Sequence, residues 1–510
     1  MPSKIIMDKL FKRKFMASAL VYALCIPLFF INIRNSHDWG DDFAQYIHQA
    51  INITKGIPQS ATGFIDDIRS PGVHISARPV GFPLILAMTC LYVGNSIKGF
   101  VITVTFILFL LCIALFSFYR KHFSDLVSIL LVLIFAYNPF TLNFKEEIMS
   151  DIPFTLFLIL VILVYSKTKG NKTLKYLLTG LLLGILISIR TIGIVLLAAL
   201  ILEDIISLWK NRRNNAIKLE IMKRALVITI TIVFVLIDFK ALFKIGIGSE
   251  YFASISFPIL RMKASYYLHS FRYFFMSGGG VFPLLAILTQ WLVVLFTTIG
   301  FLKKCFRKVD FIDFFVIIYL FALLLYPDMN SGMRFLFPVF PILIYYTVIG
   351  LMMVKINSPL KKNIIILSLG LFILIPYSFS AINIIRHQNE TLPGPQEAEA
   401  VEAFEYIKRN TPMDAKIAFN KPRALNLYTD RRTILCANQS LESIAYNNLK
   451  YNVQYLLTCT DLPDDSTKKF LMIYPDKPLL LWSNSKFSLY QLNYLIHNKK
   501  HYANANILSK

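Results

Sequence analysis

Residues 98–118 read KGFVITVTFILFLLCIALFSF, a run with no charged side chain after Lys98. A helix needs about 20 predominantly apolar residues to cross a bilayer, and this run has the required length and composition. About a dozen apolar runs of this kind occur along the chain, namely 15–33, 79–95, 98–118, 125–143, 152–166, 173–190, 192–209, 223–242, 281–302, 311–327, 334–353 and 362–380. The sequence therefore predicts an all-α polytopic membrane domain over residues 1–380.

The charge of the chain fits a membrane protein better than a nucleic-acid-binding one. Charged residues make up 16% of the 510 residues, against about 25% in ordinary soluble domains. The formal net charge is +23, but the basic residues lie mostly in short loops between apolar runs, where membrane topology accounts for them. The chain carries no DNA- or RNA-binding motif, so we expect no nucleic-acid partner.

The basic clusters also predict the topology. A basic N-terminus is expected to stay cytoplasmic. If the run 79–95 crossed fully, the later basic clusters would lie outside, against the positive-inside rule; they are 210–213, 303–308 and 361–362. If 79–95 is half-embedded, with Pro79 and Pro83 breaking it, these clusters are cytoplasmic and the acidic loops lie outside. We therefore expect about eleven crossings, with the C-terminal segment outside.

The tail, residues 381–510, has a different composition. A Pro/Gly-containing linker and an amphipathic helix are predicted within 391–412. Short β-rich runs then follow at 415–419, 431–436 and 453–459, and 478–492 has the pattern of a hairpin. The tail is expected to form a small soluble α/β domain outside the membrane.

The first acidic motif is His37-Asp38-Trp39-Gly40-Asp41-Asp42-Phe43. Apolar residues then recur from Phe43 at helical spacing, which predicts an amphipathic helix on the membrane surface. Asp41 could simply cap this helix. A cap does not require the adjacent Asp42, and a carboxylate there could act as a general base or bind a divalent cation such as Mg²⁺ or Mn²⁺.

The second acidic motif, KEEIMSDIP at 145–153, is predicted on the same face as Asp42. Carboxylates at a membrane boundary are costly unless they are paired, metal-bound or solvated. Asp151 is a candidate catalytic residue and Glu147 a candidate metal ligand beside Asp42. The alternative is a solvated loop, with Asp151 capping the next helix and Pro153 in its first turn.

Three arginines are predicted at the same face, namely Arg78, Arg190 and Arg334. Guanidinium groups bind phosphate through bidentate hydrogen bonds, so these residues are candidates for donor binding. The alternatives are snorkelling and pairing with a nearby carboxylate. The aromatic, basic stretch 243–280 is either a headgroup anchor or a mobile flap, for which Ser277-Gly278-Gly279-Gly280 would supply hinge freedom.

Taken together, these motifs resemble the GT-C superfamily of membrane glycosyltransferases. More narrowly, the chain resembles bacterial relatives of the protein O-mannosyltransferases and of the aminoarabinose transferase of lipid A. The resemblance lies in GDDFAQYIHQAINITKG, ARPVGFPLILA, NPFTLNFKEEIMSDIPF and RFLFPVFPIL, in that order, and in the tail segment EAFEYIKRNTPMDAKIAFNKPRALNLYTDRR. Many relatives have His-Pro-Pro where this chain has Arg78-Pro79-Val80.

The resemblance implies a sugar donor linked to a polyprenyl phosphate, used at the outer face of a bacterial inner membrane. It implies that Asp42 or Asp41 activates the acceptor hydroxyl or helps to hold a cation, and that Asp151 is the second acidic position. The acceptor would be a lipid, a glycan or a protein. Two other functions stay open: a transporter or flippase of a lipid-linked glycan, and a non-catalytic membrane protein whose outer domain binds a partner.

Overall fold

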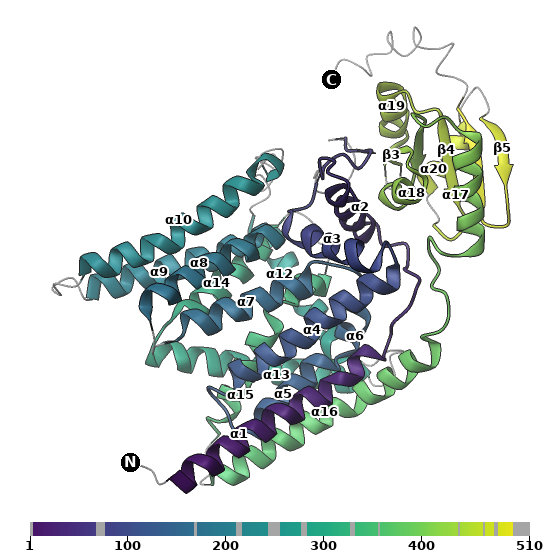
Figure 1. The fold of residues 1–510 in the computed structure, drawn as a ribbon. Helices are drawn as coiled ribbons and strands as arrows, with labels where there is room; N and C mark the ends of the chain where they lie inside the picture. Colours follow the sequence, from purple (N-terminus) through teal and green to yellow (C-terminus); the bar gives the residue numbers. More distant parts are fainter. Residues whose placement is uncertain are drawn as a thin grey trace. The chain divides into compact units, whose positions relative to one another are not determined.

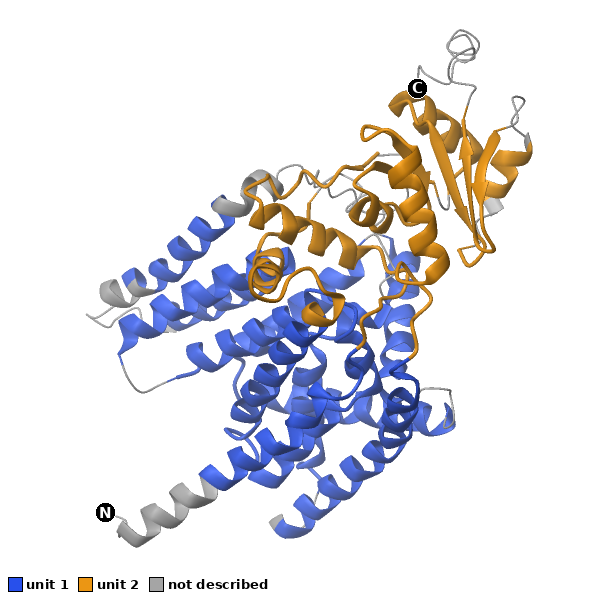
Figure 2. Cartoon of the chain, turned by 45° about the vertical axis from the view of Figure 1, so that its right-hand side comes forward, with its two compact units in different colours: residues 1–33, 101–240, 246–389 blue, residues 34–100, 241–245, 390–510 orange. Residues whose placement is uncertain are grey.

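The computed structural model describes residues 4–67, 77–167, 171–210, 217–242, 256–276, 283–326, 332–354, 358–436, 439–462, 465–473 and 478–492. The chain divides into two compact units (Figure 2). Unit 1 comprises residues 1–33, 101–240 and 246–389, and unit 2 comprises residues 34–100, 241–245 and 390–510. Each unit is therefore assembled from segments that are distant in sequence.

Unit 1 is helical (Figure 1). Its α-helices are α1 (Lys4–Cys25), α4 (Ile97–Tyr119, whose first turn belongs to unit 2), α5 (Asp125–Ala136), α6 (Pro139–Phe144), α7 (Asp151–Tyr165), α8 (Lys172–Ile189), α9 (Ile194–Lys210), α10 (Ile217–Leu242), α12 (Phe257–Phe271), α13 (Pro283–Arg307), α14 (Phe311–Leu325), α15 (Phe340–Leu351) and α16 (Pro359–His387). Short 3-10 helices are η1 (Ile26–Phe29), η2 (Thr191–Gly193), η3 (Arg272–Phe275) and η4 (Gly332–Leu336). Each predicted apolar run coincides with a helix.

Five helices among the described residues are long and apolar enough to cross a membrane. They are Ile97–Tyr119, Lys172–Ile189, Thr191–Trp209, Pro283–Arg307 and Leu360–His387. Shorter apolar helices account for the remaining predicted runs. The predicted fold class, an all-α multi-pass membrane domain with a small α/β domain, is confirmed, while the number of crossings is approximate.

Helices α13 and α15 pack closely because a glycine on each faces the other backbone. A Cβ atom at Gly300 would overlap the carbonyl of Tyr346, and one at Gly350 would overlap the carbonyl of Phe296. The hydroxyls of Thr297 and Thr347 add a 2.8 Å hydrogen bond between the same helices. Small residues allow this approach where lipid provides no hydrophobic drive for helix association.

The run 79–95 forms helix α3 (Gly81–Val93), which is 13 residues long. At 1.5 Å per residue it spans about 20 Å, less than the roughly 30 Å hydrocarbon core of a bilayer. Helices α5 and α15 have 12 residues each, so length does not distinguish α3 from them, and the half-embedded placement of 79–95 stays a prediction.

Unit 2 contains a six-stranded sheet in the order β1-β3-β2-β4-β6-β5. The strands are β1 (Phe64–Ile65), β2 (Lys416–Phe419), β3 (Arg432–Leu435), β4 (Tyr455–Cys459), β5 (Leu479–Ser483) and β6 (Phe487–Gln491). Strands β1 to β4 pair in parallel, and β5 and β6 form the predicted antiparallel hairpin. The helices are α2 (Asp42–Thr54), α3, α17 (Ala398–Asn410), α18 (Pro422–Thr429), α19 (Leu441–Tyr451) and α20 (Asp465–Ile473). The strands predicted in the tail are thereby confirmed.

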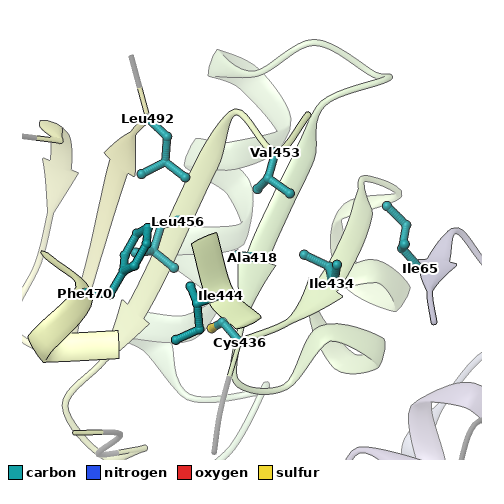
Figure 3. Close-up of a cluster of buried hydrophobic side chains, with 9 residues drawn as sticks. All are labelled: Ile65, Ala418, Ile434, Cys436, Ile444, Val453, Leu456, Phe470 and Leu492. Carbon is teal, nitrogen blue, oxygen red and sulfur yellow. The ribbon is translucent and has the colours of Figure 1, made fainter. Parts of the chain in front are cut away.

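Both faces of the sheet are covered by apolar packing. On one face, Ile444 of α19 and Phe470 of α20 pack with strand residues that include Ala418, Ile434 and Leu456 (Figure 3). On the other face, an aromatic cluster surrounds the buried Trp39. Its ring lies 6.4, 5.9 and 6.0 Å from those of Phe404, Phe419 and Phe487, respectively.

The segment after the first apolar run completes the tail domain. Trp39 enters the aromatic cluster, and β1 adds an edge strand beside β3. The carboxylate of the buried Asp67 accepts hydrogen bonds from Lys450 Nζ at 2.7 Å and from the Tyr451 hydroxyl at 2.6 Å. The domain boundary predicted between residues 380 and 381 stays a prediction. Unit 2 contains residues 34–100 in addition to the tail residues 390–510.

Candidate active site

Asp151, the first residue of α7, is a fully buried carboxylate of unit 1. Its side chain is 0% exposed and is held by two arginines. Arg190 pairs with Oδ1, and Arg334 Nε donates to Oδ2 at 3.0 Å. We call these three residues the Asp151 cluster.

The two arginines reach Asp151 from separate breaks in helical structure. Arg190 has extended backbone angles between α8 and η2, and Arg334 belongs to η4. The Arg190 guanidinium also lies 5.9 Å from the ring of Phe154 and 5.6 Å from that of Phe335. Two guanidinium groups meet at one carboxylate here, and guanidinium groups of this kind are suited to binding an anionic ligand.

The backbone just before Asp151 is strained. Ile148 is buried and has φ +47°, a left-handed conformation that β-branched residues rarely adopt. Such strain is concentrated at functional sites. The candidate metal ligand Glu147 precedes Ile148 and is half-buried.

The second acidic motif is not a freely solvated loop. Lys145 is fully buried, and its ammonium donates to the carbonyl of Asn32 at 3.0 Å and lies 3.3 Å from the Thr105 hydroxyl. The interpretation of Asp151 as a cap is also wrong, because Ser150 occupies the N-cap position and Asp151 begins the helix. Pro153 lies in the first turn of α7, as predicted.

Unit 2 contains a second group of carboxylates and arginines, which we call the Asp42 cluster: Asp41, Asp42, Arg78 and Arg423. One face of α2 holds Arg78. Asp42 pairs with its guanidinium, and Gln45 Oε1 accepts from Arg78 Nε at 3.2 Å. The buried Gln49 binds both the backbone N–H and the carbonyl of Arg78, each at 2.9 Å.

Asp41 caps a helix other than its own. Its side chain makes no capping bond to α2, so the alternative that Asp41 simply caps this helix is wrong. Oδ1 instead accepts from the backbone N–H groups of Arg423 and Ala424, at 3.0 and 3.1 Å, in the first turn of α18. Burial raises the pKa of Asp41, and the charge of Arg423 opposes that rise.

The arginines predicted to bind phosphate are paired with carboxylates here, which is the alternative considered from sequence. The structure groups Asp151 with Arg190 and Arg334, and Asp42 with Arg78. Sequence reasoning missed Gln45, Gln49 and Arg423. The spacing of Asp42, Gln45 and Gln49 places them on one helical face and could have identified the two glutamines.

The aromatic stretch 243–280 is described only from 256 to 276, so Tyr251, Phe252 and the predicted glycine hinge lie outside the described residues. In the described part, Phe271, Phe274 and Phe275 are buried. The ring of Phe274 stacks on Phe340 with centroids 4.1 Å apart. These three aromatic side chains therefore pack inside unit 1, whereas Phe257 and Tyr273 of the same stretch are exposed.

Of the two carboxylates suggested as metal ligands, Asp42 is paired with arginines, and the dependence on a divalent cation stays a prediction. Divalent cations of this class require several carboxylate or carbonyl oxygens. Asp42 Oδ1 faces Arg78 and lies 3.6 Å from Arg423, so an ion at this oxygen would compete with guanidinium groups.

Residues 77–237 match a protein family described as dolichyl-phosphate-mannose-protein mannosyltransferase. The chain is similar to the structure of ArnT from Cupriavidus metallidurans bound to undecaprenyl phosphate, with 10% identity and a TM-score of 0.56 over 94% of this chain and 98% of that one. It is also similar to the oligosaccharyltransferase AglB from Archaeoglobus fulgidus in complex with an inhibitory peptide and a dolichol-phosphate, with 11% identity and a TM-score of 0.53 over 87% and 69% of the two chains. A search of curated protein sequences finds no match.

These similarities confirm the resemblance predicted from the ordered motifs. The matched segment contains Arg78, Glu147, Asp151 and Arg190. The two solved structures share the fold of this chain over most of its length.

Proposed function

This chain has the fold of the GT-C membrane glycosyltransferases, and from that premise we propose that it transfers a sugar from a polyprenyl phosphate to an acceptor hydroxyl. The reaction would take place at the outer face of a bacterial inner membrane. The acceptor class is a lipid, a glycan or a protein. ArnT binding undecaprenyl phosphate and AglB binding dolichol-phosphate and a peptide support a lipid phosphate and a macromolecular acceptor for this fold.

The observation that carries the proposal is the pairing of each acidic motif with arginines from other segments. Asp151 is paired with Arg190 and Arg334, and Asp42 with Arg78. A donor phosphate is an anion that can replace a carboxylate as the partner of a guanidinium. Both groups are therefore suited to exchanging an internal carboxylate for the substrate.

The proposed chemistry needs a stabilised leaving group and a base. The bond between sugar C1 and the phosphate oxygen breaks, and its electron pair stays on the phosphate. Arg78 would stabilise that growing negative charge. The acceptor oxygen forms the new bond to C1, and Asp42 takes the hydroxyl proton once Arg78 has turned to the phosphate.

The test uses Asp42→Asn and a matched control. Asp125 is a suitable control because it also begins a helix, also pairs with an arginine (Arg120, 2.7 Å), and is 19% exposed against 20% for Asp42. The purified protein is assayed with polyprenyl-phosphate sugars for conversion of the donor to polyprenyl phosphate. We expect D42N to abolish transfer with an unchanged melting temperature, and D125N to retain it.

Two other outcomes would redirect the proposal. Full activity of D42N would remove Asp42 from the mechanism. Movement of a lipid-linked glycan across vesicles without release of polyprenyl phosphate would support the transporter instead. Treatment with EDTA tests the dependence on Mg²⁺ or Mn²⁺ considered from the sequence, because a required ion would make activity recoverable only when that ion is restored.

A further inference from the structure

Arg423 connects the C-terminal domain to both carboxylates of the first acidic motif. It is the second residue of α18, which lies in the tail. Its Nη1 lies 3.3 Å from Asp41 Oδ2 and 3.6 Å from Asp42 Oδ1. A residue separated from Asp42 by most of the chain therefore faces the carboxylate to which we assign the base.

The Arg423 side chain is fixed from several sides. The Asp41 carboxylate accepts from its backbone N–H and from its guanidinium. The guanidinium carbon also lies 4.6 Å from the ring centre of Phe64, a residue of strand β1. Only 16% of the side chain is exposed. These contacts fix the positively charged guanidinium group of Arg423 beside Asp42.

We propose that Arg423 is a positioning residue for sugar transfer, through which the C-terminal domain orients the Asp42 carboxylate. The inference rests on the proposed function and extends it. When Arg78 turns to the donor phosphate, Arg423 keeps a positive charge beside Asp42 and holds the carboxylate in line with the acceptor hydroxyl. The acidic motif then works only when the outer domain is folded against it.

Two other arginines of the same domain, Arg431 and Arg432, serve as controls that distinguish a positioning effect of Arg423 on kcat from an effect on protein stability. Arg431 is buried, and its guanidinium bonds to Thr411 and to nearby backbone carbonyls, so its loss affects folding. Arg432 lies next to it on β3 and is exposed. R431Q reports what destabilisation alone does to the kinetics, and R432Q reports the loss of a charge from the domain surface.

The experiment compares R423Q, R423K, R431Q and R432Q in the full-length protein, with kcat, the KM for donor and the melting temperature measured for each. Misplacement of a catalytic group by about 1 Å can cost roughly 100-fold. We expect R423Q to lower kcat by about 10- to 100-fold with little change in KM. R423K should recover part of the loss, because one Nη atom makes both contacts and an ammonium can supply a single charge there.

R431Q should lower the melting temperature while its folded fraction keeps a normal kcat, and R432Q should change neither. The inference is overturned if R423Q behaves like R432Q, or if its loss of activity only follows its loss of folded protein, as for R431Q. Absence of transfer by the parent protein would defeat the proposed function itself, and full activity of D42N would remove Asp42 from the mechanism and with it the role of Arg423. An inactive D42N beside a fully active R423Q would defeat only the role of Arg423.

Discussion

The Asp151 cluster predicts an asymmetry between substitutions of its members. Asp151→Asn removes the charge that both arginines contact, whereas Arg334→Met removes one of the two contacts and leaves Asp151 paired with Arg190. Removing one partner of a buried ion pair costs about 3–5 kcal/mol. Loss of a hydrogen bond to a charged group costs about 1.5–3 kcal/mol. We therefore expect D151N to be the more destabilising change.

The double variant D151N/R334M should cost less than the sum of its parts, because both single variants remove the same contact between Asp151 and Arg334. Coupling of residues in contact is typically about 0.5–3 kcal/mol. The measurement is the free energy of unfolding in detergent micelles during titration with a denaturing detergent, for the parent, both single variants and the double variant. Additive effects, or an R334M cost equal to that of D151N, would refute this account of the cluster.

Three further predictions concern other contacts. Gln49→Ala removes both side-chain bonds to the backbone of Arg78, so we expect about 1–3 kcal/mol of destabilisation and a lower kcat, measured by thermal unfolding and donor turnover. Gly300→Ala forces α13 and α15 apart and should cost about 1–3 kcal/mol in the same unfolding assay, with a normal melting temperature as the contradicting result. Asp41→Asn keeps an oxygen for the α18 cap but does not titrate. Because burial raises the pKa of Asp41, the parent loses stability as the pH rises through that folded-state pKa, and the stability of the variant relative to the parent should therefore increase with pH. Melting curves from pH 4 to 8 measure this, and a constant difference between variant and parent would contradict it.

Helices could be predicted from the sequence because membrane-spanning segments must satisfy their backbone hydrogen bonds internally, which produces long apolar runs. The run 98–118 became α4, and the shorter run 79–95 became α3. Strands β2, β3 and β4 could be predicted for a related reason, since each is a short β-rich run between polar segments. Strand β1 has only two residues and pairs with β3 across the sequence, so it left no comparable pattern.

The candidate site could be predicted only in part. Acidic and basic residues at a membrane boundary stand out because burial of charge is costly, and this pointed to Asp42, Asp151 and the three arginines. Their partners depend on tertiary contacts that spacing does not encode. Arg423 contacts Asp41 although the two are 382 positions apart, and its segment reads as an ordinary helix in a soluble domain.

The release of polyprenyl phosphate tests the central claim most directly. Purified protein in liposomes would be given a polyprenyl-phosphate sugar and an acceptor-containing membrane extract, with the lipid products followed by mass spectrometry. We predict that the parent protein and D125N convert the donor to free polyprenyl phosphate and a glycosylated acceptor, and that D42N produces neither. Equal conversion by D42N and the parent, or no conversion by the parent across a panel of lipid-linked hexoses and pentoses, would contradict the account.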